Sequence, residues 1–170
     1  LEGYLMPDTY EFFSNSKEIE IIRKLLSHQD KTWASQFEEQ ALETGKSRHE
    51  VLTLASIIQA EAAVRDEMQA ISGVYVNRLN KGWRLEADPT VSYALGRKGR
   101  LLYKDLEVNN PYNTYKFKGL PPGPINSPGK AAINAALNPE QHSYMFFVAK
   151  GDGSGRHFFA RTISEHNQNR

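Results

Sequence analysis

Glu61 is the side chain of this sequence best placed for acid–base chemistry. It follows Leu54, Ile57 and Ile58 by seven, four and three residues, so all four side chains share one face if the segment is helical. A carboxyl group on a core-facing stripe is costly to bury unless it is paired or has a function. The position of Glu61 therefore indicates either a specific partner or a chemical role.

Two interpretations of Glu61 follow from the helical spacing, and the spacing alone favours neither. In the first, the carboxylate turns to solvent at the helix end or pairs with Arg65, four residues further on. In the second, partial burial raises the pKa of the carboxyl group, which then stays protonated near neutral pH and can donate a proton. Cleavage of a glycosidic bond is the reaction that most often needs such an acid.

Two more carboxylates, Glu86 and Asp88, lie in the segment Arg-Leu-Glu-Ala-Asp-Pro-Thr. The Asp88-Pro89 pair is typical of a helix start, with aspartate as the cap and proline in the first turn. This pattern favours a capping role for Asp88 over a catalytic one. Glu86 is most simply a surface residue. Neither stands out as the second carboxylate that most glycosidases use.

Tyr112, Asn113, Thr114 and Tyr115 form a polar and aromatic cluster within residues 109–129, a stretch dense in Pro, Gly and Asn. So many rigid residues predict a fixed loop, and fixed loops often line binding sites. Aromatic faces beside amide and hydroxyl groups suit sugar rings. The four residues alone are more typical of a turn with two packed tyrosines, so both interpretations stay open.

Motifs for other chemistry are missing from the sequence. The five histidines have no metal-binding spacing, no serine lies in a G-x-S-x-G turn, and no glycine-rich phosphate loop is present. The absence of cysteine excludes disulfides and thiolate metal sites. A net charge of +1 gives no electrostatic reason to expect a nucleic acid or an anionic membrane as partner. We therefore expect neither a metal nor a cofactor.

Length and patterning predict one α+β domain over residues 1–170, a predominantly helical body with a small antiparallel β-sheet that includes a C-terminal hairpin. The helix that leads to Glu61 starts with a capping box of Ser47 and Glu50. The further expected elements are a helix from a Ser16 cap through 26, a segment at 33–42, helices at 65–79, 88–95 and 130–137, a helical turn at 101–106, strands at 144–149 and 157–160, and a polar tail at 165–170.

No apolar run of the chain reaches the roughly 20 residues that a membrane helix needs, and no signal peptide is visible. The chain begins at Leu1 rather than Met. We therefore expect a fragment, with any targeting segment upstream.

Several motifs, taken in order, resemble one family closely. They begin with Leu-Glu-Gly-Tyr-Leu-Met-Pro-Asp-Thr-Tyr at Leu1 and Ala-Ser-Ile-Ile-Gln-Ala-Glu ending at Glu61. They continue with Val-Asn-Arg-Leu at 76–79, Leu-Glu-Ala-Asp-Pro-Thr-Val at 85–91, Tyr-Asn-Thr-Tyr at 112–115, Gly-Leu-Pro-Pro-Gly-Pro-Ile at 119–125, Pro-Gly at 128–129, Phe-Val-Ala at 147–149 and His-Phe at 157–158. This set resembles the catalytic domain of the MltG (YceG-like) endolytic murein transglycosylases over almost all of residues 1–167.

The resemblance implies a bacterial enzyme that acts on the periplasmic side of the cytoplasmic membrane, to which an upstream single-pass helix anchors it. A LysM-like region would lie between that anchor and this domain. Such enzymes cut the MurNAc–GlcNAc β-1,4 bond within nascent peptidoglycan strands without adding water, which leaves 1,6-anhydro-MurNAc ends. The implied partners are glycan strands and cell-wall synthases, with membrane contact only through the anchor.

The family motifs also imply roles for residues of this chain. Glu61 occupies the position of the catalytic glutamate, as acid and then base. The residues that would hold the sugars and stabilise charge are Asn77, Glu86, Asp88, Thr90, Tyr112, Asn113, Thr114 and Tyr115.

This chain departs from the family pattern at three places. Gln59 stands where relatives often have glutamate, which leaves Glu61 as the only carboxylate of its motif. Glu86 replaces a common glutamine, and would alter substrate contacts or the Glu61 pKa if it faced the groove. Asn126-Ser127 varies the usual small-Asn-Pro-Gly sequence, which we interpret as a loop detail.

Two other functions remain to be distinguished from a transglycosylase. A lysozyme-like hydrolase would use Asp88 or Glu86 as a second carboxylate. A non-catalytic module of the cell-wall synthesis machinery would bind peptidoglycan as a scaffold without cutting it.

Overall fold

The central element of the fold is helix α3 (Arg48–Glu61), which is buried on all sides over two turns. The computed structural model describes residues 1–97 and 99–170. The predicted capping box is present, because the Ser47 hydroxyl accepts the Glu50 amide and the Glu50 carboxylate accepts the Ser47 amide. Every residue from Val51 to Ile58 is buried. The apolar run therefore places α3 in the core and ends it at Glu61.

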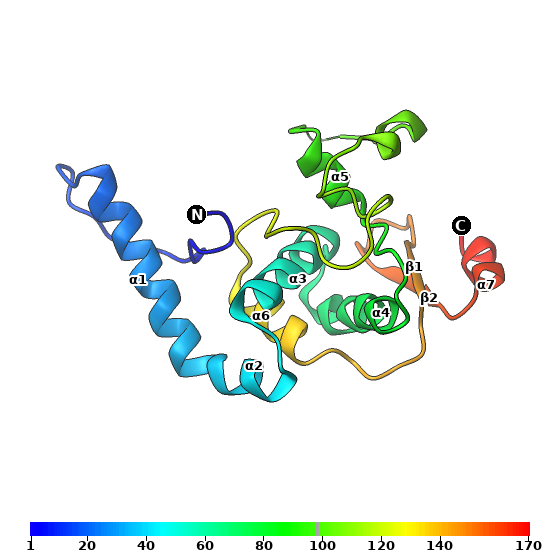
Figure 1. Ribbon diagram of the computed structural model, residues 1–170, viewed down its shortest axis with the longest axis horizontal. Helices are drawn as coiled ribbons and strands as arrows, with labels where there is room; N and C mark the ends of the chain where they lie inside the picture. The colour runs from blue at the N-terminus through cyan, green and yellow to red at the C-terminus, as the bar shows by residue number, and fades with distance from the viewer. Residues whose placement is uncertain (98) are drawn as a thin grey trace.

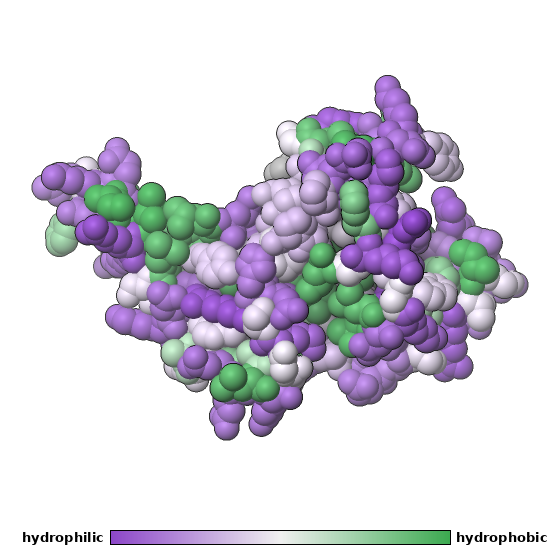
Figure 2. Space-filling model, viewed as in Figure 1, coloured by the Kyte–Doolittle hydropathy of each residue, from purple (hydrophilic) through white to green (hydrophobic). Residues whose placement is uncertain are grey.

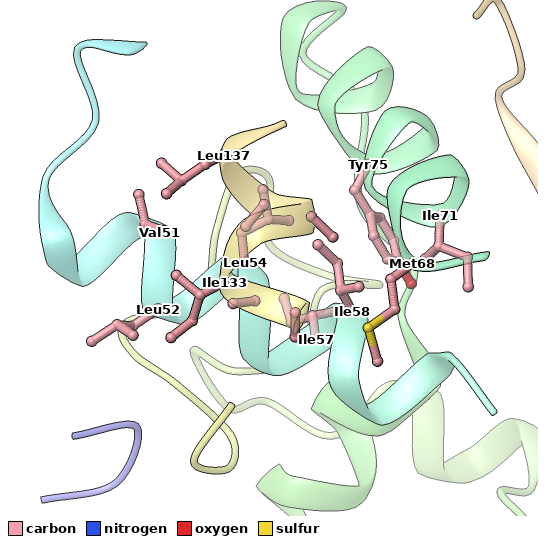
Figure 3. Close-up of a cluster of buried hydrophobic side chains, with 14 of the residues drawn as sticks. Val51, Leu52, Leu54, Ile57, Ile58, Met68, Ile71, Tyr75, Ile133 and Leu137 are labelled. Carbon is pink, nitrogen blue, oxygen red and sulfur yellow. The ribbon is translucent and has the colours of Figure 1, made fainter. Parts of the chain in front are cut away.

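Helices α4 (Met68–Asn80) and α6 (Lys130–Leu137) pack against α3 (Figures 1 and 3). Their apolar side chains, including Ile71 and Ile133, interleave with those of α3 in one cluster. A 3-10 turn, η1 (Arg65–Glu67), leads into α4 where the sequence predicted helix from Arg65 onward. Helix α6 has the bounds that the sequence predicted.

The N-terminal helices differ from the prediction in their bounds. Helix α1 (Glu18–Gln36) has Lys17 rather than Ser16 as its cap and continues through Trp33. Helix α1 ends at its cap residue Phe37, and α2 (Glu38–Thr44) follows. Figure 1 shows α1 extending away from the body, and Figure 2 shows hydrophobic surface near its start, where Phe12, Phe13 and Ile19 are exposed.

The prediction that Asp88 caps a helix is wrong. Helix α5 (Asp88–Ala94) has Ala87 as its cap, with Asp88 as the first helical residue and Pro89 next. The Asp88 carboxylate instead accepts a hydrogen bond from the Tyr115 hydroxyl at 2.6 Å. The helical turn expected at 101–106 is the 3-10 helix η2 (Tyr103–Glu107).

The C-terminal hairpin consists of strands β1 (Phe146–Ala149) and β2 (His157–Ala160), which pair antiparallel with Ala149 opposite His157. It confirms the α+β class with a small antiparallel sheet. Helix α7 (Ile163–Gln168) follows where the sequence analysis expected only a polar tail. Its sequence signal is a second capping box, Thr162 and Glu165. Among the described residues, no helix has the length and apolar character to cross a membrane.

Hydrogen bonds to α3 fix the loop at 109–129. The Ser56 hydroxyl accepts the Ile125 amide at 3.0 Å, and the Asn126 side-chain amide donates to the Ser56 carbonyl at 2.7 Å. The Gln59 side-chain oxygen accepts the Gly129 amide. This loop is therefore attached to the helix that carries Glu61.

Replacing Ser56 by Ala is expected to lower the free energy of unfolding by about 1–3 kcal/mol, because the buried Ile125 amide loses its acceptor. Urea unfolding measures the change. The Ser56 hydroxyl donates to the carbonyl three residues before it. Ser35→Ala is the matched control, since the Ser35 hydroxyl makes the same kind of bond, to the Thr32 carbonyl, but lies on an exposed residue. We expect the control to change stability by less than about 0.5 kcal/mol. Equal losses in both variants would contradict the role of Ser56 as an anchor.

Candidate active site

Glu61 opens onto a cleft at the end of α3. On one side lies a cavity of about 480 Å³, here called the hairpin hollow, lined by α4, Leu85, Glu86, Asp88, Tyr115, β1, His157 and α7. On the other side lies a cavity of about 740 Å³, the α5 hollow, lined by α5, Gly96, Arg97, Gly99, Ile125 and Asn126. Both hollows include Glu61 and Asp88. These two carboxylates therefore stand where the hollows meet.

The Glu61 carboxyl group is partly buried and has one direct hydrogen-bond partner among the described residues. The Tyr75 hydroxyl, from α4, donates to Glu61 Oε1 at 2.8 Å. Burial raises the Glu61 pKa to about 7; the Tyr75 hydrogen bond and the Arg78 charge oppose this rise, and the negative charge of Asp88 adds to it. A carboxyl group with this pKa is present as both acid and base near neutral pH.

The alternative in which Glu61 pairs with Arg65 does not describe the structure. Helix α3 ends at Glu61, and Ala62 already has an extended backbone (φ −77°, ψ 113°). Arg65 is therefore not one helical turn beyond Glu61. Among the described residues no ion pair joins the two side chains.

Arg78 is a buried cation in the wall of the hairpin hollow. Its guanidinium donates to the carbonyls of Met145 (2.8 Å) and Leu85 (2.7 Å), and lies 5.3 Å from the centre of the Phe146 ring. The Glu86 carboxylate is 3.4 Å away and half exposed. Backbone carbonyls therefore hold Arg78, and Glu86 adds a weak, solvent-screened pairing.

Glu86 adopts a left-handed backbone conformation, with φ of 51°. Its side chain lines the hairpin hollow and points to Arg78. The charges that act on the Glu61 pKa are those of Asp88 and Arg78. Glu86 thus faces the hairpin hollow, but it is not among the groups that shift the Glu61 pKa.

Asp88 and Tyr115 form the opposite edge of the cleft. Burial is the larger of two causes that raise the pKa of the Tyr115 hydroxyl. The short hydrogen bond to Asp88 is the second. Asp88 is exposed and lines both hollows. Of the eight residues expected to bind substrate, Glu86, Asp88 and Tyr115 line the cleft with Glu61.

Thr90, Asn113 and Thr114 are buried behind the cleft. The Thr90 and Thr114 hydroxyls lie 2.9 Å apart, and Thr114 also accepts the Ala87 amide. Asn113 donates to one carbonyl of η2 and to one carbonyl of the loop after it. These side chains hold the backbone that presents Asp88 and Tyr115.

Asn77 and Tyr112 also lie outside the lining of the two hollows. The Asn77 amide donates to the carbonyls of His142 and Tyr144, which fixes the segment before β1. Tyr112 packs on Tyr93 with ring centres 4.7 Å apart. Direct sugar contacts by the predicted residues stay predictions.

Sequence reasoning missed Tyr75, His157 and His166 as residues of the cleft. Tyr75 lies within the helix predicted at 65–79, and the signal that could have found it is that a buried tyrosine hydroxyl usually has a polar partner. His166 depends on α7, which was not expected. In the described part of the chain, no three His, Asp or Glu side chains cluster as ligands of a metal ion would.

Comparison with known proteins gives the family. A model of the YceG-like family matches residues 1–170. The chain belongs to the YceG-like family. A YceG-like protein of Listeria monocytogenes, solved by crystallography, is 42% identical and superposes with a TM-score of 0.93, covering 99% of this chain and 55% of that one.

Curated relatives of this YceG-like chain carry an enzyme name. "Endolytic murein transglycosylase" of Bacillus subtilis (strain 168) is 42% identical over 99% of the chain, and the protein of that name from Streptococcus pneumoniae strain D39 is 32% identical over the same share. The alignments cover 46% and 31% of those proteins. The chain thus spans less than half the length of these relatives.

Replacing Tyr75 by Phe is expected to raise the Glu61 pKa above about 7, because the lost hydrogen bond stabilises the ionised carboxylate. The ring, which packs edge-on against Phe147, is kept. Carbon-13 NMR titration of the Glu61 side chain measures the change. Tyr10→Phe is the control, since the Tyr10 hydroxyl donates to the Met6 carbonyl in the N-terminal segment. An unchanged or lower Glu61 pKa in Tyr75→Phe would contradict the assignment.

Proposed function

We propose that this domain is an endolytic lytic transglycosylase of peptidoglycan, with Glu61 as its single acid and base. The observation that carries the proposal is the partly buried Glu61 carboxyl group, with a pKa of about 7, at the junction of two open hollows. The names of the curated relatives support the same reaction. The proposal concerns the bond between MurNAc and GlcNAc.

The first step is proton transfer from Glu61 to the glycosidic oxygen. The C1–O bond of MurNAc breaks, the GlcNAc-containing part of the strand leaves as an alcohol, and positive charge develops at C1. Because Tyr75 donates to Oε1, the proton is carried by Oε2, the oxygen free of that hydrogen bond. Burying the neutral acid form costs little desolvation free energy. Glu61 is therefore protonated in a useful fraction of molecules near pH 7.

In the second step the Glu61 carboxylate acts as a base. It removes the proton of the C6 hydroxyl of the same MurNAc, and O6 bonds to C1 to close a 1,6-anhydro ring. The proton lost by Glu61 in the first step is regained, so the cycle consumes no water. The Tyr75 hydrogen bond stabilises the carboxylate between the two steps.

Asp88 is the group best placed to stabilise positive charge at C1. Its charge acts on Glu61, and the Tyr115 hydroxyl fixes one of its oxygens. An oriented carboxylate near a developing cation lowers the barrier without forming a bond. Tyr115 and Glu86 would contact the sugars in the hairpin hollow.

The two hollows suit cleavage within a strand. A polymer that passes Glu61 needs space on both sides, and the cleft provides about 480 Å³ and 740 Å³. The whole protein would carry this domain on the periplasmic side of the cytoplasmic membrane, held by an upstream single-pass anchor. Its partners would be nascent glycan strands and cell-wall synthases.

Mass spectrometry of digested glycan strands tests the reaction. Wild-type protein is expected to produce 1,6-anhydro-MurNAc ends, and Glu61→Gln to be slower by roughly 10²–10⁴-fold. The rate should fall as pH rises through about 7, since Glu61 then loses the acid proton. Reducing MurNAc ends would favour a lysozyme-like hydrolase. Binding without any cleavage by the wild-type protein would favour a scaffold module.

Replacing Asp88 by Asn is expected to slow cleavage by roughly tenfold or more, because charge stabilisation at C1 is lost. It should also move the alkaline fall of the rate to lower pH, since the Asp88 charge raises the Glu61 pKa. Glu86→Gln removes a carboxylate from the same cleft and is the matched control. The pH dependence of that variant should match the wild type. An identical pH dependence in Asp88→Asn would count against Asp88.

A further inference from the structure

Glu67 and His157 form a buried pair on the wall of the hairpin hollow. Glu67 ends η1, 90 residues before His157 at the start of β2. The Glu67 carboxylate accepts the His157 backbone amide at 3.1 Å and His157 Nδ1 at 2.9 Å. Both side chains are only 10% exposed. This Glu67–His157 pair joins the hairpin to the segment between α3 and α4.

The pairing determines which ring nitrogen carries a proton. An ionised carboxylate has no hydrogen to donate, so Nδ1 must be the donor. In a neutral ring Nε2 then has a lone pair and acts as an acceptor. Nε2 makes no hydrogen bond to any residue that the structure describes, and it is not among the fully buried unpaired atoms.

The His157 ring lines the same hollow as Glu61. The Phe147 ring lies between the two sites, edge-on to Tyr75 at 5.8 Å and to His157 at 5.3 Å. Across the hairpin, His157 is paired with Ala149, whose small side chain also lines the hollow. One rigid wall thus carries both Glu61's partner and the imidazole.

A purely structural role would use only part of the imidazole. The bonds to Glu67 involve the backbone amide and Nδ1, and leave the opposite edge of the ring free. An acceptor beside aromatic rings, here those of Phe147 and Tyr75, is an arrangement that can orient a sugar, which has an apolar face and a rim of donors.

We propose that His157 contacts the saccharide bound in the hairpin hollow, with Nε2 accepting a hydrogen bond from a sugar hydroxyl or acetamido N–H. Glu67 is a positioning residue that fixes the tautomer and the orientation of the ring. The inference rests on the proposed function, because it takes the glycan strand as the substrate. It adds a specificity-determining contact in the hairpin hollow.

Isothermal titration with a GlcNAc–MurNAc tetrasaccharide tests the contact in a Glu61→Gln background, where the sugar is not cut. His157→Asn places a side-chain amide close to the position of Nδ1, where it can still donate to Glu67. The same substitution removes the acceptor Nε2. We expect it to weaken binding by roughly 3- to 10-fold. His157→Gln extends an amide toward the position of Nε2 and should restore most of the affinity. Thermal unfolding checks that each variant is folded.

His28→Asn is the matched control, because His28 also pairs with a carboxylate, that of Asp8 at 3.0 Å, outside both hollows. It should bind the tetrasaccharide like the parent. Nitrogen-15 NMR of the parent gives a second readout that needs no change at His157. We expect the Nδ1–H tautomer, and a shift of the Nε2 signal when the tetrasaccharide is added.

The outcomes separate this inference from the proposed function. If the Glu61→Gln parent binds the tetrasaccharide, but His157→Asn binds equally tightly and the Nε2 signal does not move, the His157 contact is overturned while the proposed function stands. If the parent does not bind and the wild type yields no anhydro ends, the proposed function fails and this inference fails with it.

Discussion

The burial of one carboxyl group at the end of α3 is the constraint on which the site depends. Two fully buried turns bring Glu61 to the boundary between core and cleft, and Tyr75 of α4 supplies its hydrogen bond. Because burial raises the folded-state pKa to about 7 from an ordinary value near 4.5, the ionised form is disfavoured. The free energy of unfolding therefore falls as the pH rises from about 4.5 to about 7, by an amount on the order of a few kcal/mol. The packing of α3 against α4 and α6 offsets that cost.

A second layer of hydrogen bonds holds the opposite edge of the cleft. The Thr90–Thr114 contact and the Asn113 side chain fix the backbone on either side of Asp88 and Tyr115. Ser56, on α3 itself, anchors the loop that follows. Consequently, α3 fixes the positions of both the acid, Glu61, and the facing carboxylate, Asp88. Their separation does not depend on a flexible connection.

Local signals in the sequence predicted the parts of the fold that depend on local interactions. The capping box of Ser47 and Glu50, the bounds of α6 and the hairpin were predicted because caps, alanine-rich periodicity and glycine-rich turns act over a few residues. The helical spacing singled out Glu61 as an unusual core-facing carboxylate, and the family resemblance implied its role as acid and base. The Tyr75–Glu61 and Glu67–His157 contacts could not be predicted, since they join residues 14 and 90 positions apart through tertiary packing. The capping role predicted for Asp88 was wrong for the same reason: its partner, Tyr115, lies in a distant loop.

The partners of the three cleft carboxylates explain why only one is suited to be the acid. Tyr115 donates to Asp88, which is exposed, and Arg78 faces Glu86, which is half exposed. Solvent or a cation thus stabilises the charge on both. The charge on Glu61 is stabilised less, because burial is the largest influence on its pKa and the Arg78 charge only partly offsets it, while its one hydrogen bond among the described residues comes from a neutral hydroxyl. A hydrolase with two carboxylates would need Asp88 to attack C1 or to activate water. In the proposed mechanism Asp88 only has to remain charged, which is what its exposed position favours.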